Sequence, residues 1–266
     1  GHDVTVAPPW TLGRLSAVSR DPDTGELLQY DRVYVGHLGH YRSSRWKRPK
    51  PDVAISAVTL QGATGSRLTL SGGLSAKLKL AVPGLYNAYN ALAAATTGLA
   101  LDIAPKVIAQ SIAKTDAAFG RVERVTVEGK HLFIGLIKNP TGANEVIKTV
   151  ALEKGKKSYL VLINDNFADG TDVSWLWDAD FEELLPTTRS VTVGGTRAAD
   201  MAVRLKYAGF DPRHLAVADS LPDAVRTALQ AVPDGGTLYV LPTYTAMLAL
   251  RKYLSTMGHV PHYLDT

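Results

Sequence analysis

The sequence has 266 residues, of which 45% are hydrophobic and 20% charged, and its formal net charge is +4. These values are typical of one or two globular domains and exclude a disordered chain. Cysteine is absent, which excludes disulfides, thiolate metal ligands and a thiol nucleophile. We find no apolar run of the ~18 residues that a membrane span needs and no signal segment at the start, and we expect a cytoplasmic protein.

The first part of the chain predicts short strands followed by two helices. Residues 1–52 are rich in Gly, Pro, Arg and Tyr, show no helical period and end in the basic run 42–50. Residues 53–82 alternate with period two, which indicates antiparallel strands. An Ala-rich helix then follows Pro83-Gly84, and a second helix is predicted from Ala104 to about Ala118.

The second part predicts a doubly wound, mainly parallel α/β sheet. It opens with a hairpin that turns at Glu128-Gly129-Lys130. Apolar strand-like runs then alternate with amphipathic helices, at 131–137, 158–163, 190–194, 214–218 and 237–241 for the strands and at 142–153, 196–208, 221–232 and 243–256 for the helices. Right-handed crossovers place all strand-to-helix loops on one edge, where ligands bind in open α/β sheets.

One of these loops is unusually rich in carboxylates and large aromatic residues. The stretch "NDNFADGTDVSWLWD", residues 164–178, carries four aspartates and two tryptophans and follows the apolar run 158–163. It is either a solvated loop whose aspartates cap the next helix, or a functional loop at the ligand-binding edge.

Three other loops carry residues that suit ligand binding. Lys138 and Asn139 precede Pro140 at a helix start, where ordinary helix initiation explains them equally well. Arg121 follows a glycine, and its forked guanidinium suits phosphate or ribose as well as a surface ion pair. The Gly-rich turn "TVGGTR" (192–197) precedes a helix whose N-terminal N–H groups can hold an anion, although tight turns need glycine in any case.

Several motifs of nucleotide binding, nucleophilic catalysis and metal binding are absent from the sequence. The sequence holds no G-x-x-x-x-G-K-[ST], no G-x-S-x-G and no H-E-x-x-H. His37 and His40 lack companion ligands, and we reject a zinc site there.

The order of these loops along the chain indicates a protein family more specifically than any single loop does. "GLYNAYNALAA", "FGRVER", "KNPTG" and "NDNFADGTDVSWLWD" follow one another, and "GGTRAADMAVRLKYAG" and "LPTYTAML" come later. From about Leu28 to the end, this sequence resembles the Mur-type ATP-dependent amino-acid ligases. More narrowly it resembles the MurT-type subunits of lipid II isoglutaminyl synthase.

The resemblance implies a domain arrangement and an activity. Residues 1–52 correspond to a ribbon-like insert, 53–130 to the remainder of the ATP-binding central domain and 131–266 to a Rossmann-like C-terminal domain. Members of this family use ATP and Mg²⁺ to activate the α-carboxyl of D-glutamate in the peptidoglycan stem peptide of lipid II. A GatD-type glutaminase partner supplies ammonia, and the two chains form a heterodimer.

The resemblance also assigns roles to residues. Asn87 and Asn90 match the paired asparagines beside the adenine, with Asn90 as the first choice for the contact, and Arg121 matches an arginine on the ribose and phosphates. The positions matched to substrate binding are Lys138, Asn139, Asn164, Asp165 and Asn166. Gly135 stands where other Mur ligases carry an aspartate, so that role does not transfer.

In the MurT-type branch, an aspartate of the ligase-like subunit is thought to complete the Cys–His pair of the glutaminase. A carboxylate there accepts the imidazole N–H, fixes its tautomer and stabilises the imidazolium. Asp172 is our first choice for this residue and Asp169 the second. Trp175 and Trp177 are candidates for aromatic area at the subunit contact, with core packing equally compatible.

The sequence departs from the family in two respects. The family's N-terminal half with its P-loop lysine has no counterpart here, so we expect this chain alone to bind ATP poorly. Many MurT-type subunits carry a four-cysteine zinc ribbon, whose cysteine positions here hold Asp21, Thr24, Ser43 and Trp46. We therefore do not expect zinc, and we assign no metal-ligating residue in this sequence.

Alternative functions follow from these departures. The chain is either the amidating ligase subunit, a glutaminase-docking scaffold that has lost ATP chemistry, or another Mur-like amino-acid ligase. The basic run 42–50 has little aromatic interleaving and no nucleic-acid motif, so we expect no nucleic-acid partner. If this run has a partner, the anionic inner face of the membrane or a lipid-linked pyrophosphate fits it better than nucleic acid does.

Overall fold

The structure of the chain is a computed structural model that describes residues 51–115 and 122–261, together with the backbone of five short strands between residues 12 and 42. Contacts divide the chain into two units, Gly1–Asp52 and Val53–Thr266. Among the described residues, no helix is long and apolar enough to cross a membrane.

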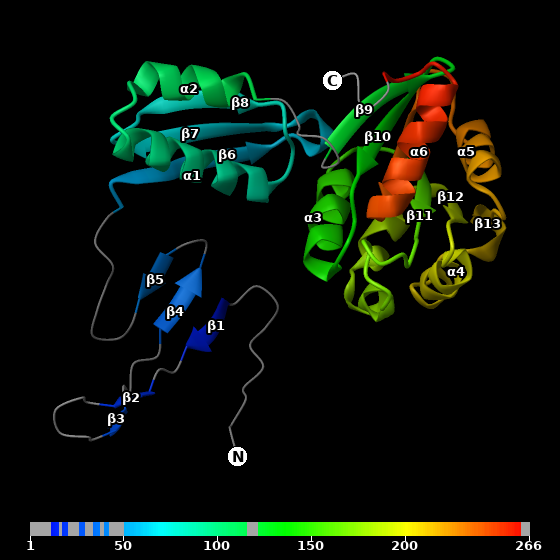
Figure 1. The fold of residues 1–266 in the computed structure, drawn as a ribbon, viewed down its shortest axis with the longest axis horizontal. Helices are drawn as coiled ribbons and strands as arrows, with labels where there is room; N and C mark the ends of the chain where they lie inside the picture. Colours follow the sequence, from blue (N-terminus) through cyan, green and yellow to red (C-terminus); the bar gives the residue numbers. More distant parts are fainter. Residues whose placement is uncertain are drawn as a thin grey trace. The chain divides into compact units, whose positions relative to one another are not determined.

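The first unit contains two small antiparallel sheets (Figure 1). One has the order β1-β4-β5, and the other pairs β2 with β3. The strands are β1 (Leu12–Leu15), β2 (Val18–Arg20), β3 (Leu27–Gln29), β4 (Tyr34–His37) and β5 (His40–Arg42). The four positions expected to hold zinc-ribbon cysteines lie outside the described residues.

The second unit begins with a three-stranded antiparallel sheet covered by two helices (Figure 1). The strands β6 (Val53–Leu60), β7 (Ser66–Gly72) and β8 (Ala76–Leu80) follow one another, with the short helix η1 (Gly62–Thr64) between the first two. Helices α1 (Leu85–Ala100) and α2 (Pro105–Ala113) bury small and branched residues against this sheet. A Cβ on Gly98 would lie 2.9 Å from the Ile108 side chain, so the glycine permits the close approach of the two helices.

A six-stranded sheet with the order β13-β12-β11-β14-β10-β9 forms the remainder of the unit. Its strands are β9 (Val122–Val127), β10 (Lys130–Gly135), β11 (Lys157–Leu162), β12 (Thr188–Gly194), β13 (Leu215–Val217) and β14 (Thr237–Pro242). All neighbouring pairs are parallel except β9 with β10, which form an antiparallel hairpin. Glu128 and Gly129 both have positive φ in its two-residue turn, as a type I′ hairpin requires.

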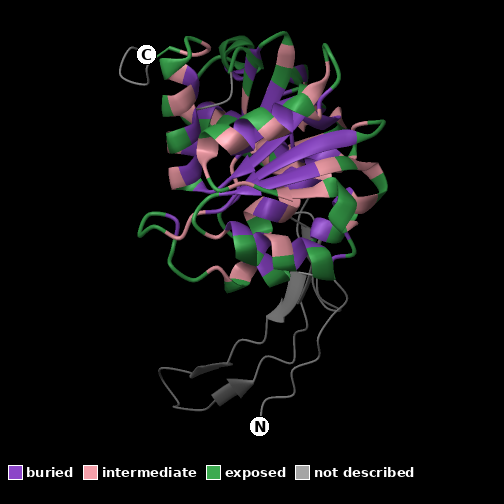
Figure 2. Cartoon of the chain, turned by 90° about the vertical axis from the view of Figure 1, so that its right-hand side faces the viewer, coloured by how far each residue is buried: buried purple, intermediate pink, exposed green. Residues whose placement is uncertain are grey.

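Helices cover both faces of this sheet, and the strands between them are buried (Figures 1 and 2). The helices are α3 (Pro140–Ala151), α4 (Ala198–Tyr207), α5 (Leu221–Gln230) and α6 (Tyr244–Thr256), with the 3-10 segments η2 (Ser174–Asp178), η3 (Phe181–Thr187) and η4 (Pro212–His214). One apolar core joins the sheet to α3, α4, η2 and η3, and a second joins it to α5 and α6. Consecutive side chains of β11 are buried because the strand has helices on both faces.

The predicted α/β class, with its Rossmann-like, mainly parallel sheet, is confirmed. Two details differ from the sequence analysis, and the domain boundary at residue 131 stays a prediction. Helix α2 ends at Ala113 rather than near residue 118, and the segment between β11 and β12 forms 3-10 turns that the apolar periodicity did not indicate. The β9–β10 hairpin belongs to the large sheet, so the domain boundary expected at residue 131 falls inside that hairpin.

Candidate functional site

The loop that leaves β11 is tied to the start of α6 by a hydrogen-bond network centred on Thr245. The Asp169 carboxylate accepts hydrogen bonds from the Thr245 backbone N–H (2.7 Å) and hydroxyl (2.5 Å). The Thr245 hydroxyl in turn accepts from the side-chain amides of Asn164 (3.0 Å) and Asn166 (2.8 Å). Only 6% of Asp169 is exposed, and its negative charge lies at the N-terminus of a helix, where the helix dipole favours it.

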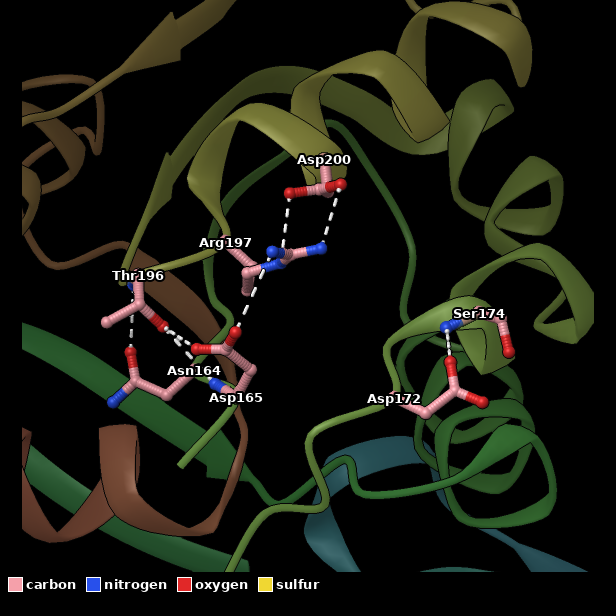
Figure 3. Close-up of polar contacts among 7 residues, drawn as sticks. All are labelled: Asn164, Asp165, Asp172, Ser174, Thr196, Arg197 and Asp200. Atoms are coloured by element: carbon pink, nitrogen blue, oxygen red, sulfur yellow. Dashed lines mark hydrogen bonds and ion pairs between the residues drawn. The ribbon is translucent and has the colours of Figure 1, made fainter. Parts of the chain in front are cut away.

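The same loop is also tied to the turn before α4 (Figure 3). The backbone N–H of Thr196 donates to the Asn164 side chain (3.1 Å), and its hydroxyl donates to the Asp165 carboxylate (2.8 Å). The Arg197 guanidinium lies 3.7 Å from Asp165 and 3.1 Å from Asp200. The N–H groups suggested as an anion site are therefore partly occupied by the protein itself.

The turn before α4 needs glycine at its second position. Gly195 has φ +94°, and a Cβ there would lie 2.3 Å from the carbonyl oxygen of Ile163. An L-residue would be strained in this backbone conformation and would collide with the exit of β11. The close approach of the two loops at this edge of the sheet therefore depends on Gly195.

Asp172 is separate from these networks and exposed (Figure 3). One carboxylate oxygen accepts a hydrogen bond from the backbone N–H of Ser174 (2.8 Å), the first residue of η2. This hydrogen bond lowers the pKa of Asp172 from its ordinary value. The group is thus an oriented, ionised carboxylate, which is the form that accepts a hydrogen bond from a neighbouring imidazole.

Beside Asp172, the segment η2–η3 is attached to α4 through Arg204. This arginine is 4% exposed and donates to the carbonyl oxygens of Leu176 (2.8 Å) and Ala179 (2.7 Å) and to both carboxylate oxygens of Glu182 (2.8 and 2.9 Å). Its hydrogen bonds to Glu182 lower the pKa of that carboxyl group. Arg204 was not among the residues predicted from the sequence.

The two tryptophans of the segment have different environments. Trp175 is half-buried and packs against the core that includes α3 and α4. The Trp177 side chain is 53% exposed, with its ring 5.8 Å from that of Tyr207 and 5.6 Å from the Arg204 guanidinium carbon. Phe167, which the sequence analysis passed over, is 98% exposed. Exposed aromatic area therefore lies on both sides of Asp172 in the sequence.

Lys138 and Asn139 lie beyond the carboxyl end of β10, on the same edge of the sheet. The Asn139 side chain accepts from the backbone N–H of Gly142 (2.8 Å) and caps α3, which begins at Pro140. Ordinary helix initiation thus accounts for Asn139. Lys138 is exposed, so its ammonium group is accessible to an anionic ligand.

The residues expected beside adenine lie on the first turns of α1. Asn87 donates to the carbonyl oxygen of Pro83 (2.7 Å) and accepts from the Asn90 amide (3.2 Å). Asn90 is exposed, and a side-chain amide with both a donor and an acceptor fits the edge of an adenine base. Arg121 lies outside the described residues.

Within residues 51–115 and 122–261, no group of three or more His, Asp and Glu side chains is arranged to hold a metal ion.

Comparison with known proteins covers strands β11 to β14 of the large sheet and the loops that follow them. Residues 136–247 match the family described as MurT ligase C-terminal. This part of the chain belongs to that family. The match covers the edge of the sheet that carries Asn164, Asp169, Asp172 and Thr245, and the MurT-type resemblance seen in the sequence is confirmed.

Longer relatives agree with this assignment. The chain is 34% identical over 238 residues to the MurT subunit of lipid II isoglutaminyl synthase (glutamine-hydrolyzing) from Streptococcus pneumoniae, covering 88% of this chain and 52% of the relative. It is 31% identical over 236 residues to the Staphylococcus aureus subunit, with the same coverage of both chains. The chain therefore spans about half the length of these relatives.

Solved structures agree in fold. MurF from Acinetobacter baumannii is similar with a TM-score of 0.62 and 19% identity, over 79% of this chain and 46% of that one. At this identity the likeness shows the Mur ligase fold alone.

Proposed function

We propose that this chain is part of the ligase-like subunit of a lipid II isoglutaminyl synthase. In this proposal the complete enzyme uses ATP and Mg²⁺ to amidate the α-carboxyl of D-glutamate in the stem peptide, with ammonia from a GatD-type glutaminase. The observation that carries the proposal is the exposed, oriented carboxylate of Asp172 on a MurT ligase C-terminal domain. The relatives named above support it.

Asp172 fits the role of third member of the partner's catalytic group better than Asp169. A residue that reaches across a subunit contact needs an accessible side chain, and Asp172 is exposed whereas Asp169 is buried. Both oxygens of Asp169 already accept hydrogen bonds from Thr245. The carboxylate of Asp172 has an oxygen beyond its bond to Ser174, and this oxygen can accept the imidazole N–H and hold the ring in one tautomer.

The remaining assignments have unequal support. Asn90 and Lys138 are exposed and remain our candidates for adenine and substrate contacts, together with Arg121 for the nucleotide. The Asn87 side chain bonds to Pro83 and Asn90, and the Asn139 side chain caps α3, which supports positioning rather than direct ligand contact.

Asn164, Asp165 and Asn166 also bond within the protein, and we assign them to shaping the substrate edge. A lipid-linked substrate places the complex at the inner face of the membrane.

The test is glutamine hydrolysis by this chain mixed with a GatD-type glutaminase, after co-purification of the two. We expect a stable complex and a rise in hydrolysis over the glutaminase alone. Asp172→Asn should abolish most of that rise, because an amide in place of the carboxylate does not stabilise the imidazolium. Asp169→Asn, measured below its unfolding temperature, should retain it. Failure to form a complex would refute the partner, and the reverse order of the two variants would refute the choice of aspartate.

A further inference from the structure

Arg204 links a rigid helix to a segment that has little regular structure of its own. The residues between β11 and β12 form the 3-10 segments η2 and η3, and their outer face is exposed. Arg204 extends from α4, which packs against β12 and β13 in the large sheet. Both α4 and α3 pack against η2, and Arg204 supplies the hydrogen bonds from the α4 side.

The contacts of Arg204 are directed at the backbone of this segment. Two of its four hydrogen bonds go to the carbonyl oxygens of Leu176, in the middle of η2, and of Ala179, the residue directly after it. The other two hold Glu182 in η3 through a paired, bidentate contact. A planar guanidinium is suited to bond these separate groups at once, whereas a lysine ammonium has no fixed fork.

Asp172 depends on the same piece of backbone. Its carboxylate is oriented by the N–H of Ser174, with which η2 begins, and Leu176 in the same turn accepts from Arg204. The Trp177 ring, between the two bonded carbonyl groups in sequence, lies 5.6 Å from the guanidinium carbon. Displacement of η2 would therefore move the N–H that aims Asp172.

We propose that Arg204 is a positioning residue for glutamine hydrolysis, which holds η2 so that Ser174 aims the Asp172 carboxylate at the partner's imidazole. This inference rests on the proposed role of Asp172. Arg204 itself touches neither glutamine nor the partner's catalytic groups. Its effect on the reaction passes through Asp172, and a purely structural arginine would have no such dependence.

A double-mutant cycle on the complex with a GatD-type glutaminase separates positioning of Asp172 by Arg204 from a purely structural role of Arg204. The kcat for glutamine hydrolysis is measured at saturating partner, well below each variant's Tm, for the parent chain, Arg204→Lys, Asp172→Asn and the double variant. We expect Arg204→Lys to lower kcat by on the order of tenfold to a hundredfold, because displacements of about 1 Å have effects of this size. In the Asp172→Asn background the same change should alter kcat less than about twofold, since coupled residues are not additive.

The control is Arg251→Lys, which alters a largely buried ion pair between α6 and Glu123 of β9, away from η2. It should lower Tm without lowering kcat in either background. If Arg204→Lys folds poorly, Glu182→Gln serves instead. It weakens one side of the bidentate contact and should give a smaller, equally Asp172-dependent fall in kcat.

Three results overturn the proposal. An unchanged kcat for Arg204→Lys shows that the Arg204 guanidinium does not position the Asp172 carboxylate. A fall of equal size in both backgrounds shows that Arg204 acts independently of Asp172. A parent-like kcat for Asp172→Asn refutes the proposed role of Asp172 first, and so distinguishes failure of the function from failure of this inference.

Discussion

Replacing Asp169 by asparagine should destabilise the protein, whereas the same change at Asp172 should not. Asp169 is buried, and its two oxygens accept from the backbone N–H and the hydroxyl of Thr245. Asparagine keeps one acceptor but places an amide N–H₂ against a hydroxyl that already accepts from two asparagine amides. The hydroxyl then loses its acceptor, and the first turn of α6 loses a negative charge.

The size of the effect follows from these two losses. A hydrogen bond to a charged group contributes about 1.5–3 kcal/mol, and a charge at a helix N-terminus about 0.3–1 kcal/mol. We expect Asp169→Asn to lower the free energy of unfolding by about 2–4 kcal/mol, which corresponds to a fall in Tm of about 4 °C or more for a unit of this size. Asp172→Asn should change it by less than about 0.5 kcal/mol because the side chain is exposed.

Urea unfolding followed by circular dichroism, with calorimetry for Tm, measures both variants. Thr245→Val is a matched variant, because it removes the hydroxyl but keeps the backbone donor to Asp169. Combining it with Asp169→Asn should cost less than the sum of the two single changes. Equal stability losses for the two aspartate variants, or a parent-like Tm for Asp169→Asn, would refute this account of the network.

Three further predictions concern the fold. Gly195→Ala should prevent normal packing of the turn before α4, because the new Cβ would lie 2.3 Å from a backbone oxygen. Gly155→Ala is the control: Gly155 has a similar φ, its Cβ would meet nothing within 4 Å, and the change should cost only about 1–3 kcal/mol of strain. The Tm values of the two variants test this difference. Burial raises the pKa of Tyr159 and Tyr239 from 10.0 to about 12, so the folded state binds these protons more tightly than the unfolded state. The free energy of unfolding should therefore fall as the pH rises from 10 to 12. A urea midpoint that stays constant over this pH range would contradict the prediction. Glu123→Gln, which removes the charge opposite an arginine of α6 in a pair only 12–13% exposed, should lower unfolding free energy by about 3 kcal/mol in urea titrations.

Much of the large sheet was predictable because its strands and helices have distinct local patterns. A strand such as β11 is apolar at consecutive positions since it is covered on both faces, and its length distinguishes it from the amphipathic helices on either side. The helix start at Pro140 was predictable for a local reason as well, because the Asn139 side chain caps the helix by accepting from the N–H of Gly142, three residues later.

The roles of individual polar residues were less predictable, because they depend on contacts between distant parts of the chain. The loop composition did not distinguish Asp169 from Asp172, and the hydrogen-bond donor to Asp169, Thr245, is 76 positions away in sequence. Arg204 did carry a signal that was missed, since it falls on the apolar face of α4 between Met201 and Leu205, where an arginine needs buried acceptors. The membership of β9 in the large sheet has no local signature either.

The strand order has a consequence for how the polypeptide acquires its structure during synthesis. Strand β14 is the last of the six to be made, yet it lies between β11 and β10 in the middle of the sheet. Until the ribosome releases it, the β9–β10 hairpin and the β11–β12–β13 group each present an unpaired inner edge. Such edges are templates for pairing with other chains. Insertion of residues 237–242 therefore closes both edges at once and completes the sheet.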